Sequence, residues 1–301
     1  MHKMRKIIMK VCAVFALLLA VTACDSEYTR YSGSNYVMFS DTMYVFPVQN
    51  SNDYFEIPVA ATQTCNYDRT VAVEVIEQAT NAVEGRHFSL EQNTVTIKAG
   101  ERVANVRMRG FHENIDVYDS LGVTLNLLVD ESDKWDLYGT RAQVELRKAC
   151  PFDINAFTGY CLVTSTYIMN YMTNIDMRLI RSEVDPEKEN TIIMRNYFYD
   201  GYDLRIEFET DDILNPLIKM DDQKFASTAV AFGTIYGDGY VMARNAPEYT
   251  SYYSSCEKFI FQYMTLYVPG MEEGSNVVGT FINAVEWISD DEAGKLMEQG
   301  Y

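Results

Sequence analysis

The chain has 301 residues, of which 48% are hydrophobic and 13% aromatic, a composition that supports packed cores and excludes a chain disordered throughout. Its formal net charge is −18, from 43 acidic residues against 25 basic residues. A surface this acidic repels phosphate groups and anionic headgroups, so the composition argues against nucleic acid as a partner and against membrane contact through the protein surface.

Residues 1–23 are predicted to be a secretory signal peptide. Four lysines and arginines make residues 3–10 basic, and the apolar run at 11–20 is too short to span a bilayer. These four are part of the 25 basic residues of the chain. Removal of the leader would therefore leave 21 basic residues against 43 acidic ones, a net charge of −22.

The leader ends in L-A-V-T-A-C at residues 19–24, which resembles the lipobox of bacterial lipoproteins. The resemblance implies that Cys24 is acylated and becomes the first mature residue, so that the membrane is a partner through this lipid. Residues 24–34 are expected to form a tether, in which Asp25 and Glu27 resemble the export signal of Bacteroidetes-type surface lipoproteins. We expect an outer-membrane location at the cell surface. A periplasmic orientation and an ordinary secreted protein with a free cysteine are the alternatives.

Residues 35–149 are predicted to form an antiparallel β-sandwich, because short segments with period-two alternation follow one another between turn residues. In the segment 103–109, Val103, Arg107 and Arg109 lie on one face, while Val106 and Met108 lie on the other. The segments with strand character are 36–39, 43–46, 54–59, 70–76, 94–98, 103–109, 121–129 and 142–147.

Part of this region carries a recognisable pattern: A-V-E-G-R-H-F at 82–88, V-T-I-K-A-G-E at 95–101 and the strand at 103–109. It resembles the Calx-beta sandwich, a family that typically places a carboxylate before the phenylalanine and acidic pairs after the following strand to hold calcium. Here His87 precedes Phe88, and H-E-N follows the strand. Calcium needs several oxygen ligands, so we predict no metal site and no cofactor, with weak surface calcium left open.

Residues 150–289 are predicted to form an antiparallel meander, for which a small up-and-down barrel is one closed form. Pro151 ends the first strand pattern, and turns such as Asp200-Gly201 and Asp238-Gly239 fit hairpins. Residues 290–301 form a short acidic tail with helical character. The expected strands are 160–168, 175–181, 191–197, 204–209, 217–220, 229–236, 240–244, 258–268 and 280–288.

Three short signals in this half are F-T-G-Y-C at 157–161, N-Y-F at 196–198, and Gln223 near Gly233. They resemble lipocalin-like β domains and the C-terminal domains of unknown function of Bacteroidetes-type lipoproteins. The resemblance implies a fold and names no activity.

Four cysteines remain after Cys24, and outside the cytoplasm they could form two disulfides in three connectivities. We expect one bridge between two of Cys150, Cys161 and Cys256, with free buried thiols as the alternative. Zinc is not predicted, because the chain contains no C-x-x-C spacing.

No catalytic constellation is found. After the leader, the chain has only His87 and His112, and it lacks the G-x-S-x-G and H-E-x-x-H motifs and both glycine-rich nucleotide motifs. We therefore predict a protein that is not an enzyme and binds no nucleotide. The paired acids at 211–212, 221–222 and 290–292 are expected to be solvated turn residues. An atypical carboxylate-dependent glycoside hydrolase would need two of them buried and facing each other.

The tyrosines are the most suggestive feature. Tyr197 and Tyr199 lie in one hairpin, and Tyr249, Tyr252 and Tyr253 lie in one loop. Exposed tyrosine rings suit sugar rings or protein partners, although tyrosines in strands often pack inward instead. The hypothesis is a non-catalytic binding or adhesion module for a glycan or an envelope protein. A structural subunit of an envelope complex is a further alternative.

Overall fold

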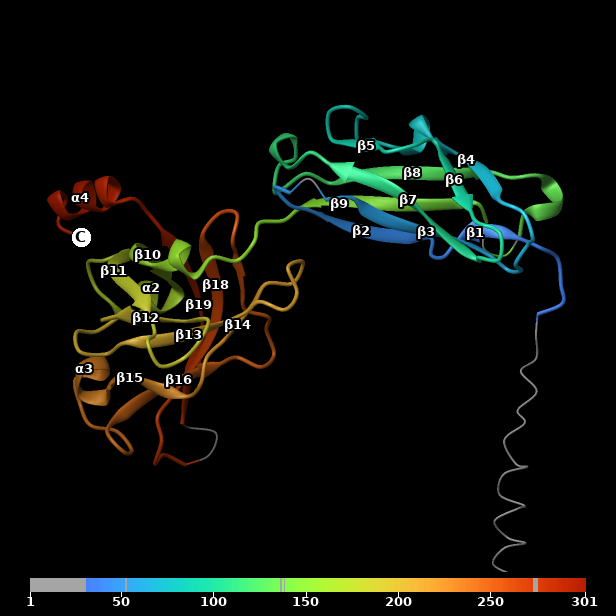
Figure 1. Cartoon of the computed structure of the whole chain (residues 1–301). Coiled ribbons are helices and arrows are strands. Elements are labelled where there is room, and N and C mark those ends of the chain that lie inside the picture. The colour runs from blue at the N-terminus through green and yellow to red at the C-terminus, as the bar shows by residue number, and fades with distance from the viewer. Residues whose placement is uncertain (1–30, 52, 136, 138, 273–275) are drawn as a thin grey trace, which may run out of the picture.

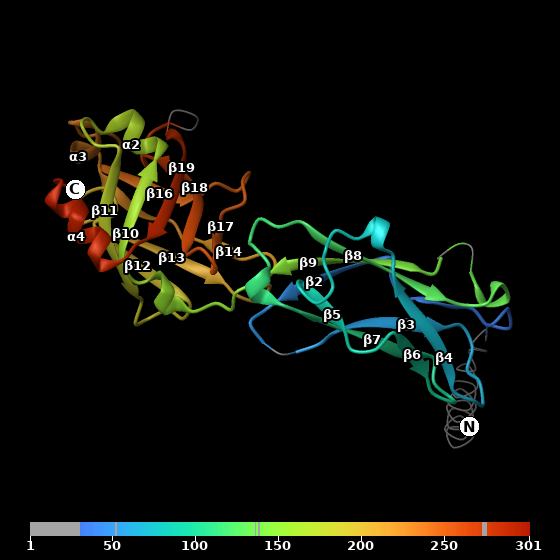
Figure 2. The ribbon, with the colours of Figure 1, turned by 90° about the horizontal axis from the view of Figure 1, so that it is seen from above.

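A computed structural model describes residues 31–51, 53–135, 137, 139–272 and 276–301. The expected leader, Cys24 and most of the expected tether lie outside these residues. Figures 1 and 2 show two β bodies that follow each other along the chain. Each has its own hydrophobic core, one drawn from residues 37–146 and the other from residues 157–285. Within the described ranges, no helix has the length and apolar character that a membrane crossing requires.

The first body is a sandwich of two sheets. One sheet has the order β1-β3-β7-β5 and the other β2-β9-β8-β4-β6. Every second residue from Leu121 to Leu127 is buried, which is the period-two pattern expected of a strand with one face on a core. The strands are β1 (Val37–Phe39), β2 (Met43–Val48), β3 (Phe55–Ala61), β4 (Arg69–Val75), β5 (Phe88–Leu90), β6 (Thr94–Ile97), β7 (Val103–Gly110), β8 (Leu121–Leu128) and β9 (Arg141–Lys148).

The prediction of a sandwich is confirmed, with one departure from a fully antiparallel arrangement. Strands β1 and β2 are consecutive but belong to different sheets, so they do not pair as a hairpin. Strand β1 pairs antiparallel with β3, whereas β2 takes the edge of the other sheet and runs parallel to β9. The alternation pattern of the sequence does not distinguish these two directions.

The second body is a closed antiparallel barrel, which confirms the predicted meander. Strands β10 to β14 pair in order, β14 pairs with β17, β17 with β18, β18 with β19, and β19 with β10. The hairpin β15–β16 lies outside this ring and pairs with the second half of β18. The strands are β10 (Gly159–Ser165), β11 (Met177–Val184), β12 (Thr191–Arg195), β13 (Leu204–Glu209), β14 (Leu217–Lys219), β15 (Gln223–Ser227), β16 (Tyr240–Asn245), β17 (Tyr252–Ser254), β18 (Phe259–Tyr267) and β19 (Val277–Trp287).

In the described part of this body, the α-helices are α2 (Thr166–Tyr171), α3 (Thr228–Phe232) and α4 (Asp290–Glu298), all short. The strand expected at 229–236 is wrong, because α3 occupies its first half. The Ser227 hydroxyl accepts a hydrogen bond from the N–H of Val230, and Gly233 ends the helix with φ of 76°. These two local caps outweigh the β propensity of the segment.

Side chains fill the interior of the barrel. Near one end, the rings of Phe157 and Phe208 lie 4.7 Å apart. Across the middle, the hydroxyl of Ser165 donates to Asn283 Oδ1 at 2.6 Å, and Asn283 Nδ2 donates to Gln262 Oε1 at 3.1 Å. These buried polar groups therefore satisfy one another, and together with the apolar core they occupy the space in which a lipocalin holds its ligand.

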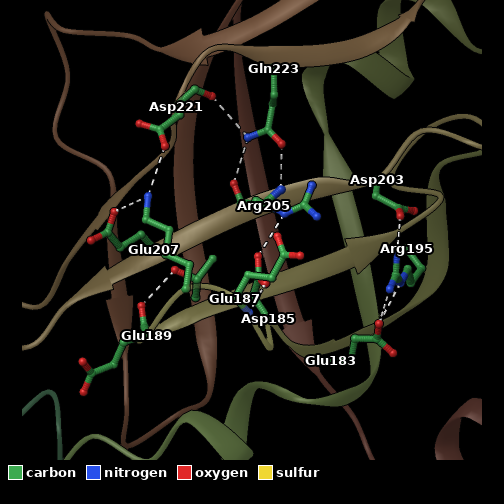
Figure 3. A network of polar contacts seen from close by, with 12 residues as sticks. Glu183, Asp185, Glu187, Glu189, Arg195, Asp203, Arg205, Glu207, Asp221 and Gln223 are labelled. Carbon is green, nitrogen blue, oxygen red and sulfur yellow. Dashed lines mark hydrogen bonds and ion pairs between the residues drawn. The ribbon is translucent and has the colours of Figure 1, made fainter.

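The outer face of β11, β12 and β13 is covered by charged side chains (Figure 3). The guanidinium of Arg195 lies between the carboxylates of Glu183 and Asp203. Next to it, Arg205 Nε donates to Asp185 at 2.9 Å, and the Asp185 side chain is only 2% exposed. This side of the barrel is a solvated, ion-paired surface, and its pairs on exposed side chains contribute little to stability.

Replacing Asp185 with Asn should lower the melting temperature at pH 7, because an amide cannot form the charge-assisted bond with Arg205. The backbone N–H of Glu187 and then Arg205 hold the pKa of Asp185 below the usual aspartate value of about 3.9. The stabilisation is therefore complete above that value and is lost as the pH falls through the lower folded-state pKa.

Thermal denaturation followed by circular dichroism from pH 7 to pH 2 would measure this difference. Asp200→Asn serves as the control, since its side chain is 95% exposed. A gap between the wild type and Asp185→Asn that stayed constant down to pH 2 would contradict the assignment.

Candidate functional site

Two of the tyrosines predicted to contact a ligand are core residues, and the prediction is wrong for them. Tyr197 is 2% exposed and Tyr253 is 3% exposed. Tyr253 packs against Phe157 and Phe208 with ring centroids 5.7 Å and 5.0 Å away, and burial raises its pKa to about 12. Tyr253 is turned inward by the alternation of β17, whereas Tyr197 lies in the bend after β12, where it and Phe198 are both buried. Both rings contribute packing.

Tyr199 is half-buried, so it is also not a free surface ring. Its hydroxyl lies 2.8 Å from the hydroxyl of Tyr167, and its ring packs on Phe225 at 5.9 Å. The prediction of a ligand contact at Tyr199 is therefore not supported by its position, which closes one end of the barrel core.

Tyr249 and Tyr252, by contrast, are 55% and 39% exposed. They lie beside three further rings that point out of β18, namely Phe259, Phe261 and Tyr263, each partly exposed. On this strand the intervening residues 260, 262 and 264 face the interior. We call the five rings of Tyr249, Tyr252, Phe259, Phe261 and Tyr263 the aromatic strip.

The rings of the aromatic strip support one another. Tyr249 stacks on Tyr263 with centroids 4.7 Å apart and planes 16° apart. Tyr252 stacks on Phe261 at 5.5 Å, and its edge meets Phe259 at 6.0 Å. From residue 259 to residue 263 the strand rises about 14 Å, so the strip is elongated. Rings held in this way lose little conformational freedom when a ligand binds.

The aromatic strip has an apolar surrounding and an acidic border. Strand register places Leu217 beside Tyr252, and Ile282 beside Tyr263. Glu286 stands opposite Phe259 in the register of β18 and β19. This side of the barrel therefore differs from the ion-paired face of β11 to β13, although both are outer faces of one barrel.

The sequence indicated Tyr249 and Tyr252 but missed Phe259, Phe261 and Tyr263. The segment F-I-F-Q-Y-M at 259–264 is apolar on both faces, so its alternation does not reveal which face is outward. Gln262, its one polar residue, would suggest the wrong face, since it is fully buried and bonded to Asn283.

The structure contains a disulfide between Cys150 and Cys256, two of the three cysteines named for a bridge. Cys161 is free and buried in the barrel core, and burial raises the pKa of its thiol to about 12. Cys65 is also unbridged and lies in the sandwich. Cys161 therefore behaves as a small hydrophobic side chain and is protonated at neutral pH.

The histidines take part in local structure. His87 is buried, and its Nδ1 accepts a hydrogen bond of 3.0 Å from the N–H of Val83. His112 Nε2 lies 3.7 Å from the Cys150 sulfur, which is engaged in the disulfide. Across the described parts of the chain, no group of three or more histidines, cysteines and acids is arranged to hold a metal ion.

The paired acids are all exposed. The side chain of Asn215 and the N–H of Leu214 lower the pKa of Asp212, and Ser289 lowers the pKa of Glu292 at the start of α4. A glycosidase acid needs the opposite shift, which burial would produce. These particular pairs therefore do not form the acid and base that the hydrolase alternative required.

Residues 137–299, which include the whole barrel, match the family model described as a domain of unknown function (DUF4984). A search of the curated proteins found no match. Among solved structures, a protein of unknown function from Bacteroides ovatus is 11% identical and aligns over 87% of this chain and 91% of its own, with a TM-score of 0.35.

Two further solved structures are similar at the same level. An auxiliary nutrient binding protein from Bacteroides thetaiotaomicron VPI-5482 is 14% identical over 82% of this chain and 91% of its own, with a TM-score of 0.33. Calcium binding domain CBD12 of CALX1.1 is 13% identical over 87% and 86%, with a TM-score of 0.34. The family match confirms the prediction that the second half of the chain is a domain of a family of unknown function.

Replacing Tyr197 with Phe should leave the protein as stable as the wild type or make it more stable. The Tyr197 hydroxyl is buried and has no hydrogen-bond partner among the described residues, and a buried unpaired hydroxyl costs about 1–3 kcal/mol. Denaturant unfolding would measure the change in free energy. Tyr253→Phe is the matched control, since its hydroxyl donates to the carbonyl of Glu209 at 3.3 Å. A larger loss for Tyr197→Phe than for the control would contradict this account.

Proposed function

We propose, from the premise that the chain belongs to the family of domains of unknown function DUF4984, that it is a non-catalytic, lipid-anchored cell-envelope protein that binds a glycan. The observation that carries the proposal is the aromatic strip, in which five rings share one outer face of the barrel.

An aromatic strip of this kind suits a sugar chain. A pyranose ring has an apolar face that packs on an aromatic ring, and its hydroxyls lie at the rim, where they can donate to carboxylates or exchange hydrogen bonds with tyrosine hydroxyls. Tyr249 and Tyr252 supply such hydroxyls, and Glu286 supplies a carboxylate at the border. The chemistry requires contact alone, so neither a cofactor nor a catalytic pair is part of the proposal.

The proposed anchoring follows from the lipobox ending at Cys24. The described chain begins at the end of the sandwich that lies away from the barrel, as both ribbon views show (Figures 1 and 2). A lipid on Cys24 would hold the chain to the outer membrane, and the sandwich would then act as a spacer that presents the barrel at the cell surface. The acidic composition supports this role, since it keeps the protein body from adhering to anionic headgroups.

Replacing both Tyr249 and Tyr252 with Ala should weaken glycan binding about tenfold or more without lowering the melting temperature. Truncating a tyrosine at the centre of a binding surface costs about 1–2 kcal/mol, and 1.4 kcal/mol is tenfold in Kd. The chain starting after Cys24 would be screened on a glycan array, and the Kd for the best ligand would be measured by calorimetry.

Tyr236→Ala provides the control for that experiment, because Tyr236 is 45% exposed and packs on Phe232 of α3, outside the aromatic strip. If the variant lacking both Tyr249 and Tyr252 bound the glycan with the same Kd as the wild type, the aromatic strip would not be the binding surface. Capture of an envelope protein instead of a glycan would favour the structural-subunit alternative.

Replacing Cys24 with Ser should release the protein from the membrane fraction, because the lipid is the proposed attachment and the protein surface is acidic. Cell fractionation measures the distribution, and mass spectrometry of the wild type should find the leader removed and acyl chains on Cys24. Cys65→Ser should stay in the membrane fraction. An unmodified Cys24, or a leader still attached, would refute the anchoring.

A further inference from the structure

We infer that the binding surface continues across the junction of the two bodies, that Tyr118 of the sandwich contacts the ligand together with the aromatic strip, and that the ligand is an extended, uncharged glycan chain. This inference rests on the proposed function. It assigns a role to the sandwich that goes beyond spacing.

Tyr118 is held in an exposed position. It is 81% exposed, a higher value than for any other large hydrophobic side chain of the described residues. Two aspartates stabilise the conformation of its loop. Asp116 Oδ1 accepts a hydrogen bond from the N–H of Tyr118 at 3.2 Å, and Asp119 Oδ2 accepts one from the N–H of Asp116 at 2.8 Å. A ring that is both exposed and fixed in place is available for a ligand at low entropic cost.

A hydrogen bond between the two bodies points Tyr118 toward the barrel. Its hydroxyl donates to the carboxylate of Glu257, which lies in the turn between β17 and β18. That bond and the negative charge of Glu257 raise the pKa of Tyr118. Glu257 stands three residues after the end of β17, the strand that begins at Tyr252, so Tyr118 lies beside the turn that follows this strand.

The disulfide holds this junction together. Cys150 follows β9, the last strand of the sandwich, and Cys256 directly precedes Glu257, with 5.2 Å between the two Cα atoms. An apolar pocket of about 360 Å³ surrounds the bond, and Val117 from the Tyr118 loop lines it together with Phe152 and Leu214. The covalent bond therefore fixes the turn that carries the partner of Tyr118 beside the end of the sandwich.

The length of the surface selects an extended ligand. The aromatic strip alone covers about 14 Å along β18, which exceeds one sugar ring. Tyr118 lengthens this surface at the Phe259 end, because its partner Glu257 stands two residues before Phe259. The negative charge around the binding surface favours an uncharged ligand. Glu257 and Glu286 stand at its border, and the chain carries far more acids than bases, so a polyanionic glycan would be repelled.

The test uses affinity electrophoresis of the chain from residue 25 to residue 301 in gels containing mannan, xylan, laminarin, soluble starch or polygalacturonate. Calorimetry then follows with the dimer and the hexamer of the sugar that retards the wild type. We expect retardation by a neutral polysaccharide and none by polygalacturonate. Tyr118→Ala should weaken hexamer binding about five- to tenfold and leave dimer binding unchanged, whereas Tyr252→Ala should weaken both.

Three companion variants sharpen the test. Tyr67→Ala is the matched control, since Tyr67 is a 60% exposed tyrosine elsewhere on the sandwich. Glu257→Gln removes the charged partner of Tyr118 and leaves the disulfide in place, so it should weaken the hexamer but not the dimer. The double variant Cys150→Ser, Cys256→Ser should also weaken hexamer binding and leave dimer binding unchanged, provided that its melting curve remains cooperative. If the double variant does not fold, the result for Glu257→Gln decides whether the junction contributes to hexamer binding.

The outcomes separate the two proposals. Loss of binding in Tyr252→Ala with unchanged hexamer binding in Tyr118→Ala would overturn the inference and leave the proposed function standing. An equal loss for dimer and hexamer in Tyr118→Ala would overturn the extended ligand, and preference for polygalacturonate would overturn its neutrality. Retention by none of the five polysaccharides, or retention unaffected by any aromatic variant, would overturn the glycan function and the inference with it.

Discussion

The pairing of β18 with β19 is the interaction on which the second body depends. The two strands pair from Phe259–Glu286 to Tyr267–Val277, and β19 then pairs with β10 to close the ring. Strand β18 also binds β17 with its first half and β16 with its second half. One strand thus joins three neighbours, and its position fixes which of its residues face the core and which face the solvent.

That position explains why the core and the candidate site are built from alternating residues of one segment of the sequence. Toward the interior, Ile260 and Met264 join the hydrophobic core, and Gln262 is accommodated because Asn283 pairs with its amide. Toward the solvent, Phe259, Phe261 and Tyr263 form the aromatic strip with Tyr249 and with Tyr252 of β17. A buried amide pair stabilises the register, because a shift by one residue would leave both polar groups unpaired and turn the rings inward.

The two outer faces of the barrel show how differently one closed sheet can be covered. On β11 to β13, charges such as Arg195 and Glu183 neutralise one another and remain solvated, so that face needs no partner. On β17 to β19, the aromatic strip and Ile282 present apolar groups whose contact with water is unfavourable, with Glu286 at the border. The two faces share one fold and differ in the chemistry of their exposed side chains. The candidate site is therefore confined to the face of β17 to β19.

The sequence by itself determined the class of both bodies and the cysteines among which a bridge could form, and it predicts the leader with its lipobox. Period-two alternation and turn residues are local signals, and local interactions produce them. The tertiary structure decided the rest: that Tyr252 is exposed while Tyr253 is buried, that Cys150 bonds Cys256, and that Tyr118 meets Glu257. The physical reason is that alternation gives the period of a strand, whereas its phase and its distant neighbours depend on which strands close the sheet.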